Sequence, residues 1–455
     1  MIGLGVVALA VACEQTSTPP PTTPDDLSSP DLTVSPDLTP FNAPSVVSVS
    51  PASGINNVPT SITITGTDFR AGATVTVGGL ACTSVVVVSS TSITCTVPAK
   101  PATCGPRDLV VSHPDDGKTG TGVKLFRYRP ISPIAWAAPV NYATPATPRR
   151  VLSFDFNADG KPDLVTVNQT GNNITVKVGL GDGTFPTGAS QNLPLGTGAS
   201  GPAEVAQGDF NADGKPDLAV VNGNNTITVF QNQGATFTAT VIATPTLAGG
   251  NTIAVGDVNG DTKLDLVIGS GTTSSVLPML GNGTGGFAAG TLRSVAGSVG
   301  DLTLADVNSD GKLDLIAANS STGNVSICLS AGSGTFANPV NAITGTSPRG
   351  VMVADLNADK KLDVVVANAT GMNVSVLLGD GVGNLAAAVN QPLGTNQPES
   401  VWVGDVNGDG LPDILAANGI SNTWSYLQGM TATQYAAPIP TATGTGAADL
   451  AVADA

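Results

Sequence analysis

The pattern of apolar residues divides the chain into three regions. Residues Ile2 to Ala12 are continuously apolar, residues 14–43 contain no apolar cluster, and from Pro44 onward short apolar or β-branched runs alternate with Gly, Pro, Asn and Asp. Short runs broken by turn residues are typical of β-strands, whereas helices need longer segments of period 3.6. The pattern therefore predicts an all-β protein.

The first region, the apolar run, predicts a signal peptide over residues 1–13. Eleven apolar residues are too few to span a bilayer and match the core of a signal sequence. Ala10 and Ala12 precede Cys13, so the segment resembles a bacterial lipoprotein signal, in which the cysteine is lipidated after cleavage. No Lys or Arg precedes the run, and Ala10 stands where Leu is more usual, so a plain secretory signal stays open. Either interpretation predicts an exported protein: secreted, or a lipoprotein of the outer membrane or cell surface whose only membrane contact is its lipid anchor.

The second region, residues 14–43, has the sequence "EQTSTPPPTTPDDLSSPDLTVSPDLTPFNA". Segments rich in Pro, Ser, Thr and Asp lack the apolar residues for a core, so we expect a disordered linker. Thirty extended residues reach up to about 90 Å.

Residues 44–130 contain several short strand-like runs and predict a small β-sandwich. The stretches "VSPASG", "ITITGTDF", "VTVGG" and "CTSVVVVSSTSITCTVPA" resemble the IPT/TIG family of immunoglobulin-like domains, whose members are usually spacer or binding modules. Cys82 and Cys95 could form a local disulfide in an exported protein, and the sequence assigns Cys104 no role.

Residues 134–455 are built from repeats. An Asp that opens each copy recurs at positions 155, 209, 257, 306, 355 and 405, and a seventh start appears at Asp454. Each unit of about 50 residues contains four apolar runs, which is the size of one propeller blade. The run around Trp136 predicts a lone outer strand before the first copy. We therefore expect an immunoglobulin-like sandwich followed by a β-propeller of four-stranded blades, with six full repeats and a truncated seventh.

Each repeat carries the pattern D-x-N-x-D-x-x-x-D between its first and second runs. Oxygen ligands at positions 1, 3, 5 and 9, with a backbone carbonyl at 7, suit a hard cation, and calcium tolerates such irregular cages. The candidate calcium ligands are Asp155, Asn157, Asp159 and Asp163; Asp209, Asn211, Asp213 and Asp217; Asp257, Asn259, Asp261 and Asp265; Asp306, Asn308, Asp310 and Asp314; Asp355, Asn357, Asp359 and Asp363; and Asp405, Asn407, Asp409 and Asp413.

An EF-hand is excluded, because position 12 is never Glu and the flanks are β-branched runs. Position 6 is Gly in four loops but Thr262 and Lys360 in the third and fifth, where we expect weaker sites. The alternative is that Asp and Asn only cap tight turns.

The repeats resemble the FG-GAP/VCBS repeats of integrin-alpha-type β-propellers, and "DFNADGKPDL" is close to the usual loop of that family. The resemblance implies calcium in hairpin loops at the blade edges, where it supports the fold. Ligands in such propellers typically bind to other loops on one face.

Composition narrows the function. A net charge of −16 argues against nucleic acid as a partner. His113 is the sole histidine, so a Ser-His-Asp triad or a His-rich metal centre is excluded, and we expect no enzyme. The leading hypothesis is an exported, surface-anchored, calcium-stabilised adhesion or binding protein with an extracellular protein or glycan as partner. The alternatives are a lectin-like propeller, with sugar stacked on Trp402, Trp424 or Tyr426, and an accessory part of a secreted enzyme.

Overall fold

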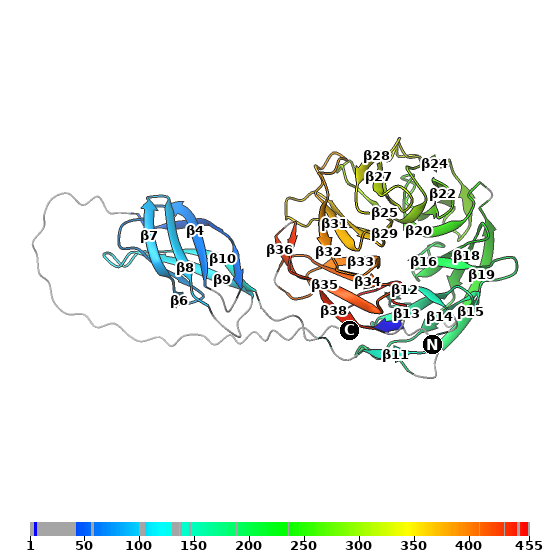
Figure 1. Cartoon of the computed structure of the whole chain (residues 1–455), viewed down its shortest axis with the longest axis horizontal. Coiled ribbons are helices and arrows are strands. Elements are labelled where there is room, and N and C mark those ends of the chain that lie inside the picture. The colour runs from blue at the N-terminus through cyan, green and yellow to red at the C-terminus, as the bar shows by residue number, and fades with distance from the viewer. Residues whose placement is uncertain are drawn as a thin grey trace, which may run out of the picture. The chain divides into compact units, whose positions relative to one another are not determined.

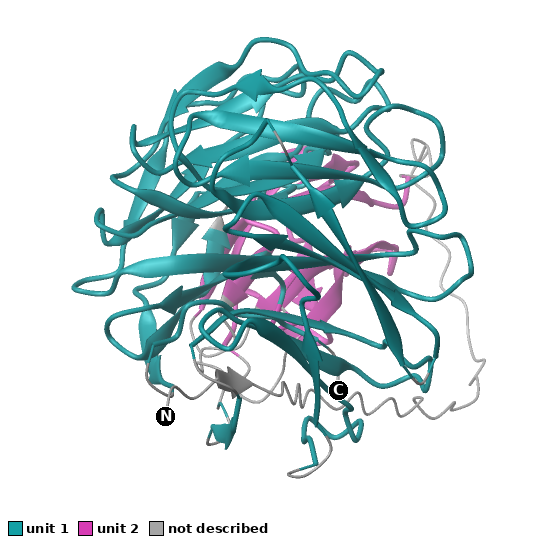
Figure 2. Cartoon of the chain, turned by 90° about the vertical axis from the view of Figure 1, so that its right-hand side faces the viewer, with its two compact units in different colours: residues 1–9, 136–405, 411–455 teal, residues 10–135, 406–410 magenta. Residues whose placement is uncertain are grey.

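Every regular element that the computed structural model describes is a β-strand. No helix in this part of the chain is long and apolar enough to cross a membrane. The residues divide into two compact units, one built mainly from residues 136–455 and the other from residues 10–135 (Figure 2). The described residues are 4–6, 42–55, 59–99, 105–129, 136, 139–144, 147–186, 190–234, 236–244, 246–408, 410–431, 433–443 and 446–453.

The smaller unit is a two-sheet sandwich. Strand β4 alternates buried and exposed residues along its length, as expected for a strand with one face in a core. Ile64, Ile93, Leu109 and Phe126 are fully buried between the sheets. One sheet has the order β2 (Ser45–Ser50), β4 (Thr60–Thr67), β8 (Ser92–Val97), β7 (Thr83–Ser89); the other has β3 (Ser53–Ile55), β10 (Thr119–Arg129), β9 (Gly105–Ser112), β5 (Thr74–Val77), β6 (Leu80–Ala81).

The larger unit is a ring of antiparallel sheets, which confirms the predicted propeller architecture (Figure 1). Each sheet is a meander whose strands follow one another along the chain. In order they are β12 (Pro148–Phe154), β13 (Asp163–Asn168), β14 (Asn173–Lys177) and β15 (Ser190–Pro194); β16 (Pro202–Gly208), β17 (Asp217–Asn222), β18 (Thr226–Asn232) and β19 (Phe237–Ala243); β20 (Gly250–Gly256), β21 (Asp265–Ser270), β22 (Ser275–Gly281), β23 (Phe287–Ala289) and β24 (Arg293–Ser294); β25 (Val299–Ala305), β26 (Asp314–Asn319), β27 (Asn324–Cys328) and β28 (Val340–Ile343); β29 (Pro348–Ala354), β30 (Asp363–Asn368), β31 (Asn373–Leu377) and β32 (Val389–Pro392); β33 (Pro398–Gly404), β34 (Asp413–Asn418), β35 (Thr423–Leu427) and β38 (Ile439–Ala442).

The second strand of each blade is buried along its whole length. This explains why these segments are apolar without alternation, since both faces of each sheet pack against neighbouring blades. Val165 and Val167 of the first blade, for example, share a core with Leu218 and Val220 of the second. The core of the propeller therefore lies between successive sheets.

The first strands of the blades, β12, β16, β20, β25, β29 and β33, contact one another in sequence around the axis. The segment 446–453 lies beside β12, where the Asp449 carboxylate accepts a hydrogen bond from Val151 N at 3.0 Å. Asp301 makes the equivalent bond to Val351 N, also at 3.0 Å, between the fourth and fifth blades. The segment thus occupies the place of an innermost strand next to the first blade.

Two short pairs complete the larger unit. Strand β11 (Val140–Tyr142) pairs with β1 (Leu4–Val6), which lies in the predicted signal segment, and β36 (Gly429–Thr431) pairs with β37 (Gln434–Tyr435). Cys13, Cys104, Asp409 and Asp454 lie outside the described residues, as does most of the predicted linker.

Candidate metal-binding loops

Each Asp-rich loop joins the innermost strand of a blade to the second strand. Position 1 follows the innermost strand directly, as Asp155 follows β12, and position 9 is the first residue of the second strand, as Asp163 opens β13. Because the two strands are paired in register up to the loop, every blade presents its loop at the same end of the hairpin.

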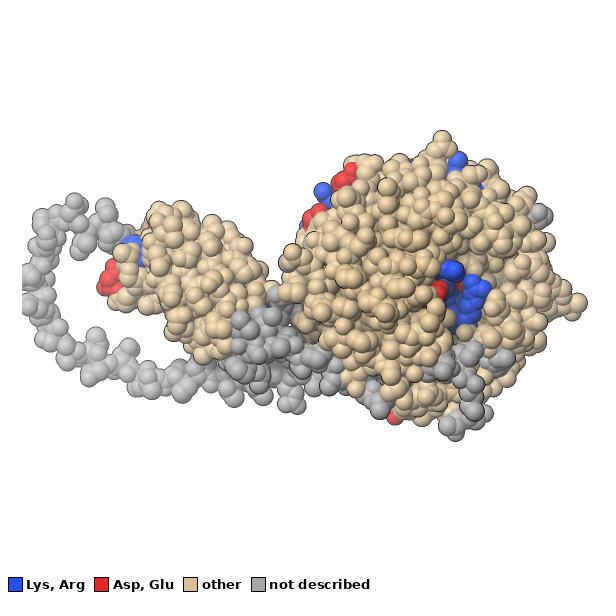
Figure 3. Space-filling view, viewed as in Figure 1, with Lys and Arg blue, Asp and Glu red and all other residues tan. Residues whose placement is uncertain are grey.

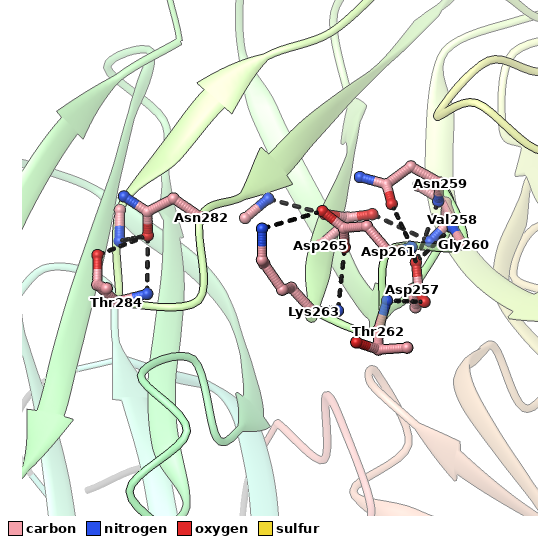
Figure 4. A network of polar contacts seen from close by, with 12 residues as sticks. Asp257, Val258, Asn259, Gly260, Asp261, Thr262, Lys263, Asp265, Asn282 and Thr284 are labelled. Carbon is pink, nitrogen blue, oxygen red and sulfur yellow. Dashed lines mark hydrogen bonds and ion pairs between the residues drawn. The ribbon is translucent and has the colours of Figure 1, made fainter.

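Positions 1, 3 and 5 close the loop through side-chain hydrogen bonds, as the third loop illustrates (Figure 4). Asp257 accepts backbone N–H bonds from Asp261 at 3.2 Å and from Thr262 at 2.7 Å. Asn259 Oδ1 accepts from Asp261 N at 2.8 Å, and Asp261 Oδ1 accepts from Lys263 N at 3.0 Å. The first, second, fourth and fifth loops repeat this set. The sequence pattern is therefore also a hydrogen-bonded turn.

Position 6 has a left-handed backbone in every loop. Gly160 has φ of +81°, whereas Thr262 and Lys360 are held at φ of 67°. Side chains with a Cβ pay a steric cost in this region, so the structure confirms the expected strain in the third and fifth loops. A Cβ built on Gly160 meets nothing within 4 Å. A residue with a side chain at this position would therefore be disfavoured by its backbone conformation and not by a clash.

Position 9 has a different environment from positions 1, 3 and 5. The Asp163 side chain is fully buried, and its two oxygens accept N–H bonds from Phe156 at 3.1 Å and from Gly179 at 2.7 Å. Phe156 belongs to the loop and Gly179 follows the third strand, so one carboxylate joins three consecutive segments. The same pair of bonds is made by Asp217, Asp265, Asp314 and Asp363.

Burial raises the pKa of the Asp163 carboxyl, and the two backbone N–H groups oppose that shift. Four other position-9 carboxyls show the same balance. Position 5, in contrast, is exposed and lies 3.3 to 3.9 Å from the Lys side chain at position 7 in four loops, and solvent screens such an exposed ion pair.

The donor chemistry of the loops fits calcium, since every candidate ligand is a carboxylate or amide oxygen. In the described part of the chain, however, no three Asp, Glu, His or Cys side chains converge as a metal-holding group. The buried position-9 carboxylate points its oxygens at backbone N–H groups, so a shared ion would use their remaining lone pairs. An open hollow of about 400 Å³ lies beside the first two loops, and its lining includes Asp155, Asp209 and Lys215.

The other residues singled out from the sequence lie apart from the loops. Cys82 and Cys95 are buried free thiols in the sandwich core, so this structure does not contain the proposed disulfide. Trp424 and Tyr426 are buried in the sixth blade, and Trp136 packs edge-on against Trp424 with ring centroids 4.2 Å apart. Both therefore serve packing instead of forming an exposed sugar platform.

His113 is buried in the sandwich, where Arg70 donates a hydrogen bond to its Nδ1 at 2.7 Å and also pairs with Asp115 and Asp116 at 2.7 Å. Burial lowers the pKa of His113, and the Arg70 charge lowers it further. A neutral histidine held as an acceptor by arginine has a structural role in this position.

Two features of the propeller were not predicted from the sequence. A buried Asn ends most second strands; Asn368, for example, donates to Ser375 Oγ at 2.8 Å. Equivalent bonds hold the third strand to Asn168, Asn222, Asn319 and Asn418, and the recurrent Asn in "VTVN" or "VVAN" was the available signal. The second feature is a charged cluster on the axis, including Arg149, Arg150 and Glu204; the residue type at these positions differs from repeat to repeat.

Comparisons with known proteins agree with this architecture. The model of the FG-GAP-like repeat matches residues 155–220, 209–268, 257–317, 306–366 and 355–416, and that of the IPT/TIG domain matches residues 44–128. The contact site A protein of Dictyostelium discoideum is 39% identical over 90 residues, so the chain spans only 17% of that relative.

Among solved structures, a protein from Lactobacillus plantarum is 12% identical and superimposes with a TM-score of 0.51, covering 83% of this chain and 98% of that one. An auxiliary nutrient binding protein from Bacteroides ovatus is 15% identical with a TM-score of 0.38, covering 83% and 96%. At 12% identity the likeness to the Lactobacillus plantarum protein concerns the fold alone.

Proposed function

Because the chain belongs to the family of FG-GAP-like repeat proteins, we propose that it is an exported, surface-anchored binding or adhesion protein whose propeller is stabilised by calcium. Its blades would serve as a scaffold, and its partner would be an extracellular protein or glycan. The propeller would carry no catalytic centre. Cys13 would hold the chain to the membrane through a lipid.

The repeated loop supports this proposal most directly. Positions 1, 3 and 5 place oxygen atoms in one exposed turn, and the same arrangement occurs in at least five blades. The two carboxylates in this single turn repel each other, and a divalent cation bound between them relieves that repulsion. Calcium bound there would stiffen the hairpin end of each blade.

Calcium binding can be measured by titration calorimetry on the chelator-treated full chain. We expect uptake of several ions, and Asp310→Asn should lower the stoichiometry by one site, because it removes an exposed carboxylate from the fourth loop. Asp182→Asn is the matched control: Asp182 caps a turn through Thr184 N at 2.9 Å but belongs to no Asp-rich loop. Absence of calcium uptake by the wild-type chain would refute the proposal, as would an equal loss in the control.

The partner and the anchor need separate tests. Binding to a glycan array would favour the lectin-like interpretation, whereas capture of a defined extracellular protein without glycan binding would favour adhesion. Anchoring predicts incorporation of labelled palmitate by the wild-type chain and none by Cys13→Ser. Equal labelling of both chains would rule out Cys13 as the lipidation site.

A further inference from the structure

The innermost strands share a second repeated feature, which lies at their first residues. In each of the six sheets the register slips by one residue near the start of the innermost strand, for example between Pro148 and Arg150. Such a bulge changes the direction of the side chain at the extra residue. We call this extra residue the upper axial position and the residue after it the lower axial position; they precede position 1 of each loop by six and five residues.

A small cavity lies on the axis where these positions meet. Its volume is about 80 Å³, and apart from Arg150 its lining consists of upper axial residues: Arg149, Asn251, Gly300, Arg349, Glu399 and Ala448. These residues come from different blades and from the segment 446–453, so the cavity is a property of the closed ring. Lys and Arg atoms are visible in the central depression of the propeller (Figure 3).

In the lower axial layer three carboxylates, those of Glu204, Asp301 and Asp449, act on the single guanidinium of Arg150. Arg150 Nε lies 3.3 Å from Glu204 Oε1, and Arg150 Nη1 lies 3.9 Å from Asp449 Oδ1. Asp301 accepts hydrogen bonds from Thr252 Oγ1 at 3.0 Å, from Leu302 N at 2.9 Å and from Val351 N. These groups hold the blades together.

Within the described residues, neither arginine of the upper axial layer has a carboxylate partner within 4.0 Å. Arg149 donates to the amide oxygen of Asn251, which carries no charge. Arg349 is exposed to the cavity mouth, and within the described residues no hydrogen bond or ion pair reaches its guanidinium. Glu399 lines the same cavity, yet no ion pair within 4.0 Å joins it to Arg149 or Arg349. Two arginines are therefore left with unused donors in one cavity.

The electrostatic setting of Arg149 combines charges of both signs. Burial lowers the pKa of Arg149, and the neighbouring charges of Arg150 and Arg349 lower it further, against the opposing fields of Glu204 and Glu399. Arginine stays charged in proteins, so the repulsion is not relieved by loss of a proton. The chain as a whole has only 18 Lys and Arg against 34 Asp and Glu, yet three arginines line this one cavity.

Glycine keeps the cavity open next to Arg349. A Cβ on Gly300 would lie 2.4 Å from Pro348 O, so only glycine permits the fourth and fifth blades to approach at this level. The upper axial residue also differs between repeats, although the loops that follow are nearly identical.

We propose that the axial cavity is a binding site for a small oxyanion, such as sulfate, phosphate or a carboxylate group, held by the guanidinium groups of Arg149 and Arg349. Planar guanidinium groups present paired N–H donors that match the oxygens of such anions. A cavity of about 80 Å³ admits a group of a few atoms and excludes a large ligand. Glu399 lines the same cavity, and its negative charge opposes the binding of an anion.

The proposal is tested by calorimetric titration of the full chain with sodium sulfate, phosphate and acetate, at ionic strength held constant with chloride. We expect saturable binding of one anion, at least a tenfold loss of affinity in Arg349→Gln, and a severalfold gain in Glu399→Gln. Arg349 is exposed and unpaired within the described residues, so its variant should keep the wild-type melting temperature. Lys124→Gln, which removes one positive charge from the sandwich, should bind like the wild type.

The three anions separate the sources of the oxyanion. Binding of sulfate and phosphate alone would indicate a tetrahedral ligand, and binding of acetate as well would indicate that a carboxylate suffices. Arg149→Gln gives a second test at the other guanidinium and should also lose affinity. Absence of saturable binding by any anion overturns the proposal, and so does binding that Arg349→Gln leaves unchanged.

Discussion

The buried carboxylate at position 9 gives the sharpest prediction, because the structure and the calcium hypothesis assign it different tasks. Asp363 is fully buried and accepts backbone N–H bonds from Leu356 at 2.9 Å and from Gly379 at 2.8 Å. In Asp363→Asn the amide oxygen can keep one bond, while its NH₂ group faces the other N–H. One buried donor is then unsatisfied, which costs about 1–3 kcal/mol.

We therefore expect Asp363→Asn to lower the free energy of unfolding by about 2 kcal/mol and Asp363→Ala, which frees both donors, by about 4 kcal/mol. Relief of carboxylate desolvation keeps these values moderate, since burial already raises the pKa of Asp363. Urea unfolding of the full chain gives the change, measured once with chelator and once with saturating calcium. Asp359→Asn, at the exposed position 5 of the same loop, is the control and should cost less than about 0.5 kcal/mol in chelator.

The comparison of the two conditions decides the role of position 9. A structural clamp predicts the same loss for Asp363→Asn with and without calcium. If the variant were as stable as the wild type in chelator and weaker only in calcium, the carboxylate would act as a metal ligand, and the reasoning from its backbone hydrogen bonds would be refuted.

Three further outcomes are expected. Lys360→Gly should raise the free energy of unfolding by about 0.5–1 kcal/mol in a urea melt, because glycine relieves the left-handed backbone at φ 67°; a loss of stability would contradict this. Gly300→Ala should lower it by about 1–3 kcal/mol, since the added Cβ meets Pro348 O, and a neutral result would show that the blades can move apart. The single imidazole signal of His113 should titrate below pH 6.5, because folding favours its neutral form; that contribution to stability is complete above pH 6.5 and is lost as the pH falls through the lowered pKa. A midpoint at or above 6.5 would contradict the Arg70 contact.

Much of the fold follows from local sequence. The repeat spacing and the continuous apolar runs such as "DVVVAN" predict the blade and its buried second strand, because both features reflect packing that recurs in every repeat. The alternation in "SITITGT" likewise predicts one face in the sandwich core. The blade could be predicted because its pattern occurs in every repeat, so that each copy is a separate observation of the same environment.

The candidate site was harder to predict from the sequence, because the spacing of Asp and Asn residues does not show which groups their side-chain oxygens face. Asp363 looks like one more ligand in D-x-N-x-D-x-x-x-D, and only the folded chain shows that Leu356 and Gly379, seven residues before and sixteen after, donate to it. The axial arginines could not be predicted because they belong to no repeated motif. Arg149 and Arg349 lie 200 residues apart, and no local pattern links them until the ring closes.

The central claim is that calcium in the Asp-rich loops supports the propeller. Differential scanning calorimetry of the full chain, with calcium and then with excess chelator, tests it most directly. Ions bound to the folded loops and released on unfolding must raise the melting temperature, by an amount that grows with calcium concentration. We expect chelation to lower the melting temperature of the propeller by well over a few degrees; a transition at the same temperature in both conditions would contradict the claim.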